Sequence, residues 1–185
     1  MAGYVVVLDA NVLYGIDVTD LMATMATRRL FRLLWSPQIL DEVSRSLGKR
    51  PDLDPEAIAR RVDFLNRALP GALVEVPAAL ITAMPVNEKD RHVLALAVHI
   101  GAPTIDTDNL RDFPKELCEP FDIEAVTADS FTLAQVHLRR DEVLTSIDSM
   151  AARRRRPPRT RREIVARLGR YLPTAMAALE IDDTA

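Results

Sequence analysis

The segment Tyr4-Val5-Val6-Val7-Leu8 constrains the fold most, because its residues follow one another without a polar break and three of them are β-branched. Such a run is typical of a strand that is buried on both faces of a parallel sheet. The run ends at Asp9. The sequence therefore places a carboxylate directly after a buried strand.

Strand and helix patterns alternate after this segment. Further strands are predicted at 33–35, 73–76, 103–106 and 123–126. Helices are predicted at about 37–47, 55–69 and 87–100, from capping residues, from proline in the first turn and from apolar residues at helical spacing. The alternation predicts an α/β fold, a mainly parallel sheet flanked by helices.

The strand pattern disappears after residue 126. Helical segments are predicted at about 128–138, 140–152, 160–170 and 173–180. The prolines at 157 and 158 cannot continue a helix, so the arginine-rich stretch before them is expected to be a linker. We expect an α/β domain over residues 1–126 and a helical C-terminal extension over residues 127–185.

Composition excludes several classes of protein. Hydrophobic residues make up 48% and charged residues 28% of the 185 residues, as in ordinary globular domains. Cys118 is the single cysteine, which excludes an intramolecular disulfide and a thiolate zinc cluster. No apolar run approaches the ~20 residues that cross a bilayer, and the N-terminus lacks the features of a secretory signal. We therefore expect a cytoplasmic protein without a membrane partner.

Charge is distributed unevenly along the chain. Residues 151–185 contain nine arginines and four acidic residues, so this segment has a net charge of +5 within a chain of −3. The first 150 residues therefore have a net charge of −8. We expect Arg153, Arg154, Arg155 and Arg156 to bind phosphates of an anionic partner. The alternative is that these arginines face solvent or pair with the acidic body.

Carboxylates recur near the expected carboxyl ends of the strands, where ligands bind in open α/β sheets. A cluster of carboxylates repels itself unless a cation neutralises it, and ligands that are all oxygen select Mg²⁺ or Mn²⁺. Such an ion can activate water against a phosphodiester. Each of these residues alone could equally be a helix cap, a turn residue or a solvated charge. The candidates are Asp9, Glu42, Asp90, Asp108 and Asp112.

Four motifs together resemble those of the PIN-domain nucleases, and within them the VapC toxins of toxin–antitoxin pairs. They are Val7-Leu8-Asp9-Ala10-Asn11-Val12-Leu13, Leu40-Asp41-Glu42-Val43, the helix start Asn87-Glu88-Lys89-Asp90-Arg91-His92, and Asp106-Thr107-Asp108-Asn109-Leu110-Arg111-Asp112-Phe113. The resemblance extends over residues 4 to about 126. It implies a PIN-like, Rossmann-like parallel sheet.

The resemblance also implies roles for single residues. Asp9, Glu42, Asp90 and Asp112 would be catalytic, and Asp9, Asp90 and Asp112 would hold Mg²⁺ or Mn²⁺. Asp108 competes with Asp112 for the fourth acidic role, because many VapC toxins have an acid where this chain has Asn109. The residues that would orient these ligands through hydrogen bonds are Asn11, Thr107 and Asn109.

The function that the resemblance implies is endonucleolytic cleavage of structured RNA, such as transfer or ribosomal RNA. It further implies a homodimer and neutralisation by a cognate antitoxin. Two alternatives stay open. One is a PIN-type nuclease in RNA maturation or DNA processing without an antitoxin, and the other is a catalytically silent RNA-binding module.

Overall fold

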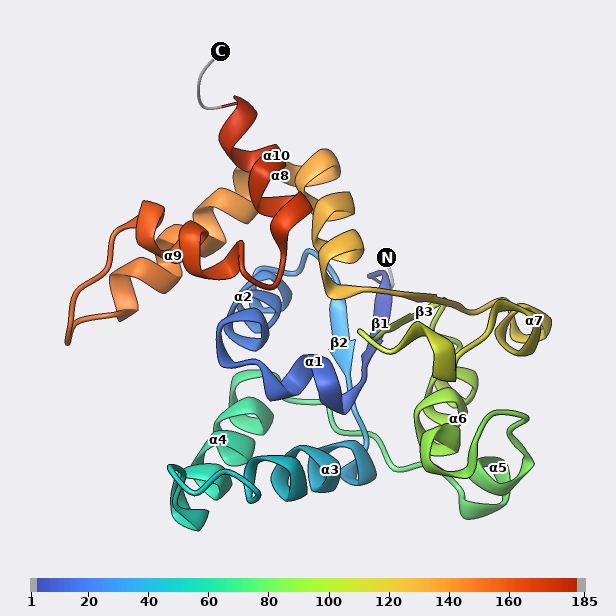
Figure 1. Cartoon of the computed structure of the whole chain (residues 1–185). Helices are drawn as coiled ribbons and strands as arrows, with labels where there is room; N and C mark the ends of the chain where they lie inside the picture. The colour runs from blue at the N-terminus through green and yellow to red at the C-terminus, as the bar shows by residue number, and fades with distance from the viewer. Residues whose placement is uncertain (1–2, 183–185) are drawn as a thin grey trace.

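A four-stranded parallel sheet lies at the centre of the computed structural model, which describes residues 3–182. Its strand order is β2-β1-β3-β4, and helices flank the sheet (Figure 1). The strands are β1 (Val5–Leu8), β2 (Arg32–Leu34), β3 (Thr104–Asp106) and β4 (Glu124–Val126). The predicted fold class, a PIN-like α/β sheet with a helical C-terminal extension, is confirmed.

Helices connect the strands and continue after the last one. In chain order they are α1 (Ala10–Tyr14), α2 (Ile16–Thr27), α3 (Pro37–Leu47), α4 (Pro55–Ala68), α5 (Ala78–Ala83), α6 (Arg91–Ile100), α7 (Lys115–Cys118), α8 (Ala128–Arg153), α9 (Arg161–Leu168) and α10 (Pro173–Asp182). Short 3-10 turns occur at Glu88–Asp90, Leu110–Asp112 and Glu119–Phe121. Among the described residues, no helix is long and apolar enough to span a bilayer.

The helix starts follow the capping residues of the sequence. Ser36 caps α3, because its hydroxyl accepts a hydrogen bond from the amide of Ile39, and Pro37 occupies the first helical position. Thr160 and Glu163 form a capping box at the start of α9. The two helices predicted at 128–138 and 140–152 are the two halves of α8, which Arg139 interrupts with non-helical backbone angles.

The strand predicted at 73–76 is wrong. Leu73 makes only an isolated bridge to Trp35, flanked by two backbone hydrogen bonds of 2.9 Å. No longer ladder can form there, because β2 has already ended at Leu34 and α3 begins at Pro37. The α1 and α2 helices and the short α5 are further elements that the sequence patterns did not predict.

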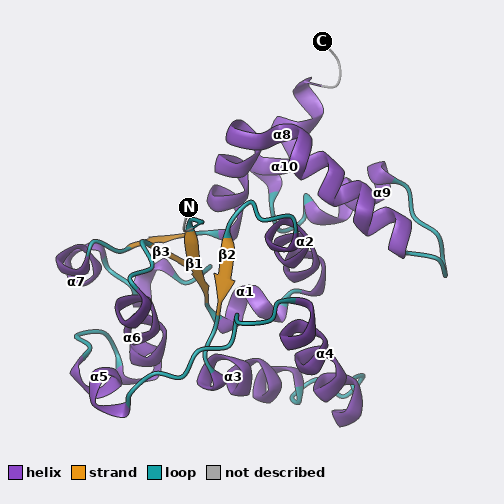
Figure 2. Cartoon of the chain, turned by 180° about the vertical axis from the view of Figure 1, so that it is seen from behind, coloured by secondary structure: helices purple, strands orange, loops and turns teal. Residues whose placement is uncertain are grey.

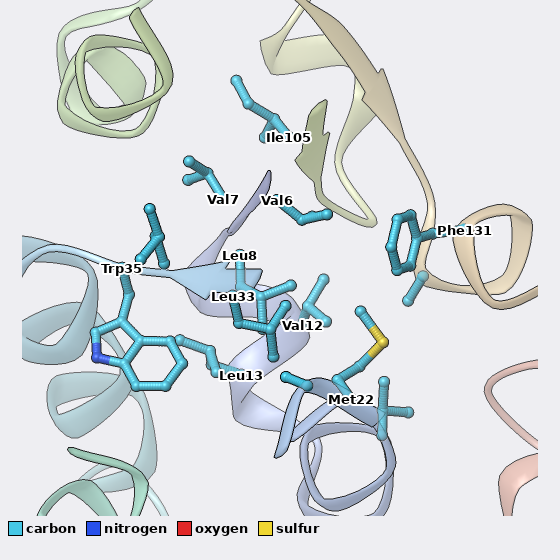
Figure 3. Packing of buried hydrophobic residues seen from close by; sticks show 14 of the residues in the cluster. Val6, Val7, Leu8, Val12, Leu13, Met22, Leu33, Trp35, Ile105 and Phe131 are labelled. Carbon is cyan, nitrogen blue, oxygen red and sulfur yellow. The ribbon is translucent and has the colours of Figure 1, made fainter. Parts of the chain in front are cut away.

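The apolar core surrounds β1, as the continuous hydrophobic run requires. Val6, Val7 and Leu8 are fully buried, and Figure 3 shows these residues with Trp35 and Met22 around them. Phe131 of α8 packs edge to face on Phe31 at a centroid distance of 4.9 Å. The C-terminal helices thus share the core of the sheet.

Ion pairs also join the C-terminal helices to α2, which they accompany in Figure 2. Arg167 lies 2.7 Å from Asp17, and Arg154 lies 3.2 Å from Asp20 and 3.6 Å from Asp17. Arg153 lies 2.8 Å from Asp20 and donates to Thr24. We call this group of arginines and aspartates the α2 clamp.

The division of the chain into two domains at residue 126 stays a prediction. The last strand, β4, ends at that residue.

The topology places a crevice between β1 and β3. β1 pairs with β2 on one side and with β3 on the other, so the strand order reverses at this point. In open parallel sheets, ligands bind at such a reversal, outside the carboxyl ends of the strands. The amide of Asp9 donates a 3.0 Å hydrogen bond to the carbonyl of Asp106, which fixes the two strand ends together.

Candidate active site

Asp9 is the acidic residue at the end of β1. Its side chain is the N-cap of α1, because Oδ1 accepts a 2.6 Å hydrogen bond from the amide of Ala10. Oδ2 accepts hydrogen bonds of 2.7 Å each from Asn11 Nδ2 and Thr107 Oγ1. Asp9 therefore caps a helix and also presents a carboxylate of fixed orientation at the crevice.

Asn11 and Thr107 connect the start of α1 to the loop that follows β3. Asn11 Nδ2 also donates to Thr107 Oγ1 at 2.9 Å, and Asn11 Oδ1 accepts from the amide of Asp108 at 3.0 Å. Thr107 Oγ1 further accepts from the amide of Asn109 at 3.1 Å. The residues predicted to support the ligands thus hold the two loops in one arrangement around Asp9.

Asp90 and Asp112 lie on the other side of the crevice. Asp90 is the N-cap residue of α6 but makes no side-chain cap hydrogen bond, and the alternative that it complements the helix dipole stays open. Lys89 Nζ lies 2.7 Å from Asp112 Oδ2 and 3.5 Å from Asp90 Oδ2. Asn109 Nδ2 donates to Asp112 Oδ2. Asp112 is therefore held by two donors, and Asp90 lies within ion-pair distance of Lys89.

Glu42 approaches from α3 and faces His92 of α6. His92 Nε2 lies 3.7 Å from Glu42 Oε2, and the imidazole is almost fully buried. Burial lowers the pKa of His92, against the opposing charges of Asp9 and Asp90. Burial of the ring therefore favours its neutral form beside Glu42.

These acidic side chains share one cavity of about 690 Å³. The residues that line it are Asp9, Ala10, Asn11, Tyr14, Glu42, Arg45, Ser46, Lys49, Lys89, Asp90, Asn109 and Asp112. Four segments far apart in the sequence therefore bring the four predicted catalytic acids to one place.

Burial raises the pKa values of three carboxylates in this cavity, and mutual repulsion adds to the effect for two of them. Burial raises the pKa of Asp9, and hydrogen bonds from Thr107 and Ala10 limit the shift. Burial and then the charge of Asp9 raise the pKa of Glu42. Burial and then the charge of Asp112 raise the pKa of Asp90 to about 6. Carboxylates with raised pKa values in one cavity are what a divalent cation would neutralise.

The donor set fits a hard cation, because the cavity offers carboxylate oxygens and no thiolate. Asp90 Oδ2 is buried and has no hydrogen-bond partner, although Lys89 Nζ lies 3.5 Å from it. Across residues 3–182, no three acidic, histidine or cysteine side chains are already arranged to share one ion. Lys89 instead lies between Asp90 and Asp112.

Asp108 is placed differently from Asp112. Its side chain is exposed and does not line the cavity, whereas its backbone amide supports Asn11. This arrangement favours Asp112 for the fourth acidic role.

The four arginines predicted to bind phosphates fall into two pairs. Arg153 and Arg154 belong to the α2 clamp, which agrees with the alternative that they pair with the acidic body. Arg155 and Arg156 are exposed.

Sequence reasoning gave no role to two groups of residues, of which Asp106 lies at the end of β3 and the others line the cavity. Asp106 is fully buried, both of its carboxylate oxygens lack a partner, and burial raises its pKa well above the ordinary value. Arg45, Ser46 and Lys49 line the cavity, and their spacing of three, four and seven residues after Glu42 could have indicated a shared helix face.

Comparisons with known proteins bear on the family that this chain resembles. Residues 128–180 match the family model described as "VapC50 C-terminal domain". Over 94 residues the chain is 38% identical to a protein of Mycobacterium tuberculosis (strain ATCC 25618 / H37Rv) named "Putative ribonuclease VapC50". That alignment spans 51% of this chain and 56%, or about half, of the relative. No solved structure matched. The chain is thus similar to a VapC-type ribonuclease, and its C-terminal helices match the VapC50 C-terminal domain.

Proposed function

We propose that this chain is a metal-dependent endoribonuclease, a VapC-like toxin that blocks translation and is neutralised by a cognate antitoxin. The observation that carries the proposal is the convergence of Asp9, Glu42, Asp90 and Asp112 on one cavity at the strand reversal. The similarity to a protein named as a ribonuclease supports the same reaction.

Asp9, Asp90 and Asp112 would hold Mg²⁺ or Mn²⁺, with Glu42 as a further carboxylate beside them. Such an ion, when bound, lowers the pKa of a water molecule and stabilises negative charge on the phosphate. Asn11 and Thr107 keep Asp9 pointing into the cavity, and Asn109 does the same for Asp112. The raised pKa of Glu42 makes its carboxylate a better proton acceptor at neutral pH.

The substrate would be structured RNA such as transfer or ribosomal RNA. Arg155 and Arg156 are exposed, and no ion pair engages them in the described part of the chain, so they remain candidates for phosphate contacts. The proposed toxin acts in the cytoplasm as a homodimer. Light scattering on the purified protein tests the dimer, and co-expression with the product of a neighbouring short reading frame tests the antitoxin.

The decisive experiment is induced expression in a bacterium of the wild type beside Asp9→Ala, with RNA 5′ ends mapped across the transcriptome. We expect growth arrest and discrete new ends from the wild type and neither from the variant. Asp41→Ala is the matched control, because Asp41 is an exposed acid that precedes Glu42 and does not line the cavity. Its effects should equal those of the wild type.

Equal cleavage by the wild type and Asp9→Ala would contradict the catalytic assignment. Expression of folded wild type without new RNA ends would favour a silent RNA-binding module. Comparison of Asp108→Ala with Asp112→Ala assigns the fourth acid. We expect Asp112→Ala to abolish cleavage and Asp108→Ala to retain most of it.

A further inference from the structure

The outer part of α3 presents positive charge to the acidic cavity. Glu42, Arg45, Ser46 and Lys49 follow one another at intervals of three, one and three residues, and all four line the cavity. This spacing places them on one face of the helix and its C-terminal turn. The face therefore changes from an acid to two cations along its length.

Arg45 and Lys49 form no ion pair within 4.0 Å in the described part of the chain, although Arg45 lies close enough to Glu42 to affect its pKa. Both residues are exposed, and Arg45 makes only a weak 3.4 Å hydrogen bond to the carbonyl of Asp41. Other arginines near the surface are engaged, such as Arg67 with Asp63 at 2.7 Å and Arg153 with Asp20 at 2.8 Å. Arg45 and Lys49 are thus cations held beside an acidic site without being used by the fold.

The position of Arg45 and Lys49 beside the carboxylates suits them to bind phosphates. An acidic cavity repels the phosphates of RNA, so a nuclease of this kind needs cations next to its carboxylates to hold the strand. The charge of Arg45 already acts on Glu42, whose pKa is raised by burial and by Asp9 and opposed by Arg45. Ser46 adds a hydroxyl between the two cations, which can donate a hydrogen bond to a phosphate oxygen.

We propose that Arg45 and Lys49 bind phosphates of the RNA strand that flank the bond to be cleaved, so that the strand crosses the cavity along α3. The inference rests on the proposed nuclease function and specifies how the substrate is held. It assigns the main RNA contact to α3, whereas Arg153 and Arg154 serve the α2 clamp.

The test measures binding of fluorescein-labelled oligouridylate by anisotropy over a range of salt concentrations. All variants carry Asp9→Asn, so that the probe is not cut. Each phosphate contact contributes about 0.7 to the slope of log affinity against log salt for a single strand. We expect Arg45→Gln and Lys49→Gln each to lower the slope by about 0.7 and to weaken binding on the order of five-fold at 0.1 M salt.

Arg67→Gln is the matched control, because it removes an exposed arginine that lies on α4 and does not line the cavity. We expect its slope to equal that of the parent. Arg45→Lys should keep most of the slope, since it keeps the charge. Thermal melts verify that each variant is folded.

An unchanged slope in the folded Arg45→Gln and Lys49→Gln variants would overturn the proposal. A reduced slope in Arg155→Gln and Arg156→Gln with no change at α3 would also overturn it and would place the contact on the arginine stretch. Cleavage by otherwise wild-type protein is followed separately. Cleavage together with an unaffected slope refutes the α3 contact alone. A slope that depends on Arg45 and Lys49 without cleavage refutes the nuclease function alone.

Discussion

Lys89 Nζ lies 2.7 Å from Asp112 Oδ2 and 3.5 Å from Asp90 Oδ2, between two of the carboxylates that would hold the metal ion. The ammonium group thus neutralises part of the acidic cavity in the absence of a divalent cation. An ion that binds Asp90 and Asp112 has to displace this contact and then experiences the repulsion of Lys89.

Lys89→Met is therefore expected to tighten Mn²⁺ binding by about ten-fold, a change of about 1.4 kcal/mol. Titration calorimetry on the protein without RNA measures this affinity. Lys115→Met is the control, because Lys115 is exposed on α7 and pairs with Glu119. Weaker Mn²⁺ binding in Lys89→Met would show that the lysine assists the metal site instead of competing with it.

Metal binding should depend on pH through Asp90. Its pKa of about 6 means that the carboxylate becomes protonated as the pH falls through 6. Mn²⁺ affinity should accordingly drop between pH 7 and pH 5. Calorimetry at these two pH values measures the change, and an affinity that is constant down to pH 5 would contradict the raised pKa.

The stability of the metal-free protein should change in the opposite direction. The pKa of Asp90 is about 6 in the folded chain and 3.8 in a model peptide, so folding binds a proton between these values. The stabilising contribution is complete below pH 4 and is lost as the pH rises through 6. In EDTA, lowering the pH from 7.5 to 5 should raise the melting temperature, and Asp90→Asn should reduce that increase.

Thr107→Val should weaken the metal site while leaving the fold intact. The substitution preserves the shape of a fully buried side chain and removes the hydroxyl that donates to Asp9 and accepts from Asn11. Loss of such supporting contacts costs about 10- to 100-fold in metal affinity or activity. Thr82→Val is the control, since the exposed Thr82 hydroxyl only bonds the carbonyl of Ala78. Equal effects of the two substitutions would count against this role.

The α2 clamp should stabilise the chain more than ordinary surface pairs do. Arg167→Met leaves Asp17, whose side chain is only 11% exposed, without its closest partner. We expect the free energy of unfolding to fall by about 1–3 kcal/mol. Arg67→Met breaks the exposed pair with Asp63 and should cost well under 1 kcal/mol. Urea denaturation compares the two variants, and equal costs would argue that the clamp has no special weight.

Patterns within short segments predicted the helices and strands that depend on neighbouring residues alone. The Ser36-Pro37 pair predicted the start of α3, and the β-branched run predicted β1. Both signals depend only on residues that are neighbours in the sequence. The strand expected at 73–76 failed for a nonlocal reason, since a strand needs a partner and β2 had ended. No periodicity within a single segment could reveal that missing neighbour.

At the candidate site, too, some residues could be predicted from local motifs, whereas contacts between distant segments could not. The motifs indicated Asp9, Glu42, Asp90 and Asp112, which the fold brings to one cavity. The partners of Arg153 and Arg154 could not be predicted, because Asp17 and Asp20 lie more than 130 residues earlier in the chain. Nor could the burial of Asp106, which depends on how helices cover the sheet.

The edge-to-face contact of Phe31 with Phe131 has a practical consequence for anyone who wishes to isolate the α/β part of the chain. A polypeptide that stopped at residue 127 would lack the aromatic ring that shields Phe31. Its newly exposed apolar surface would favour self-association, so the shortened chain should be recovered in aggregates unless the missing helices are supplied as a separate chain.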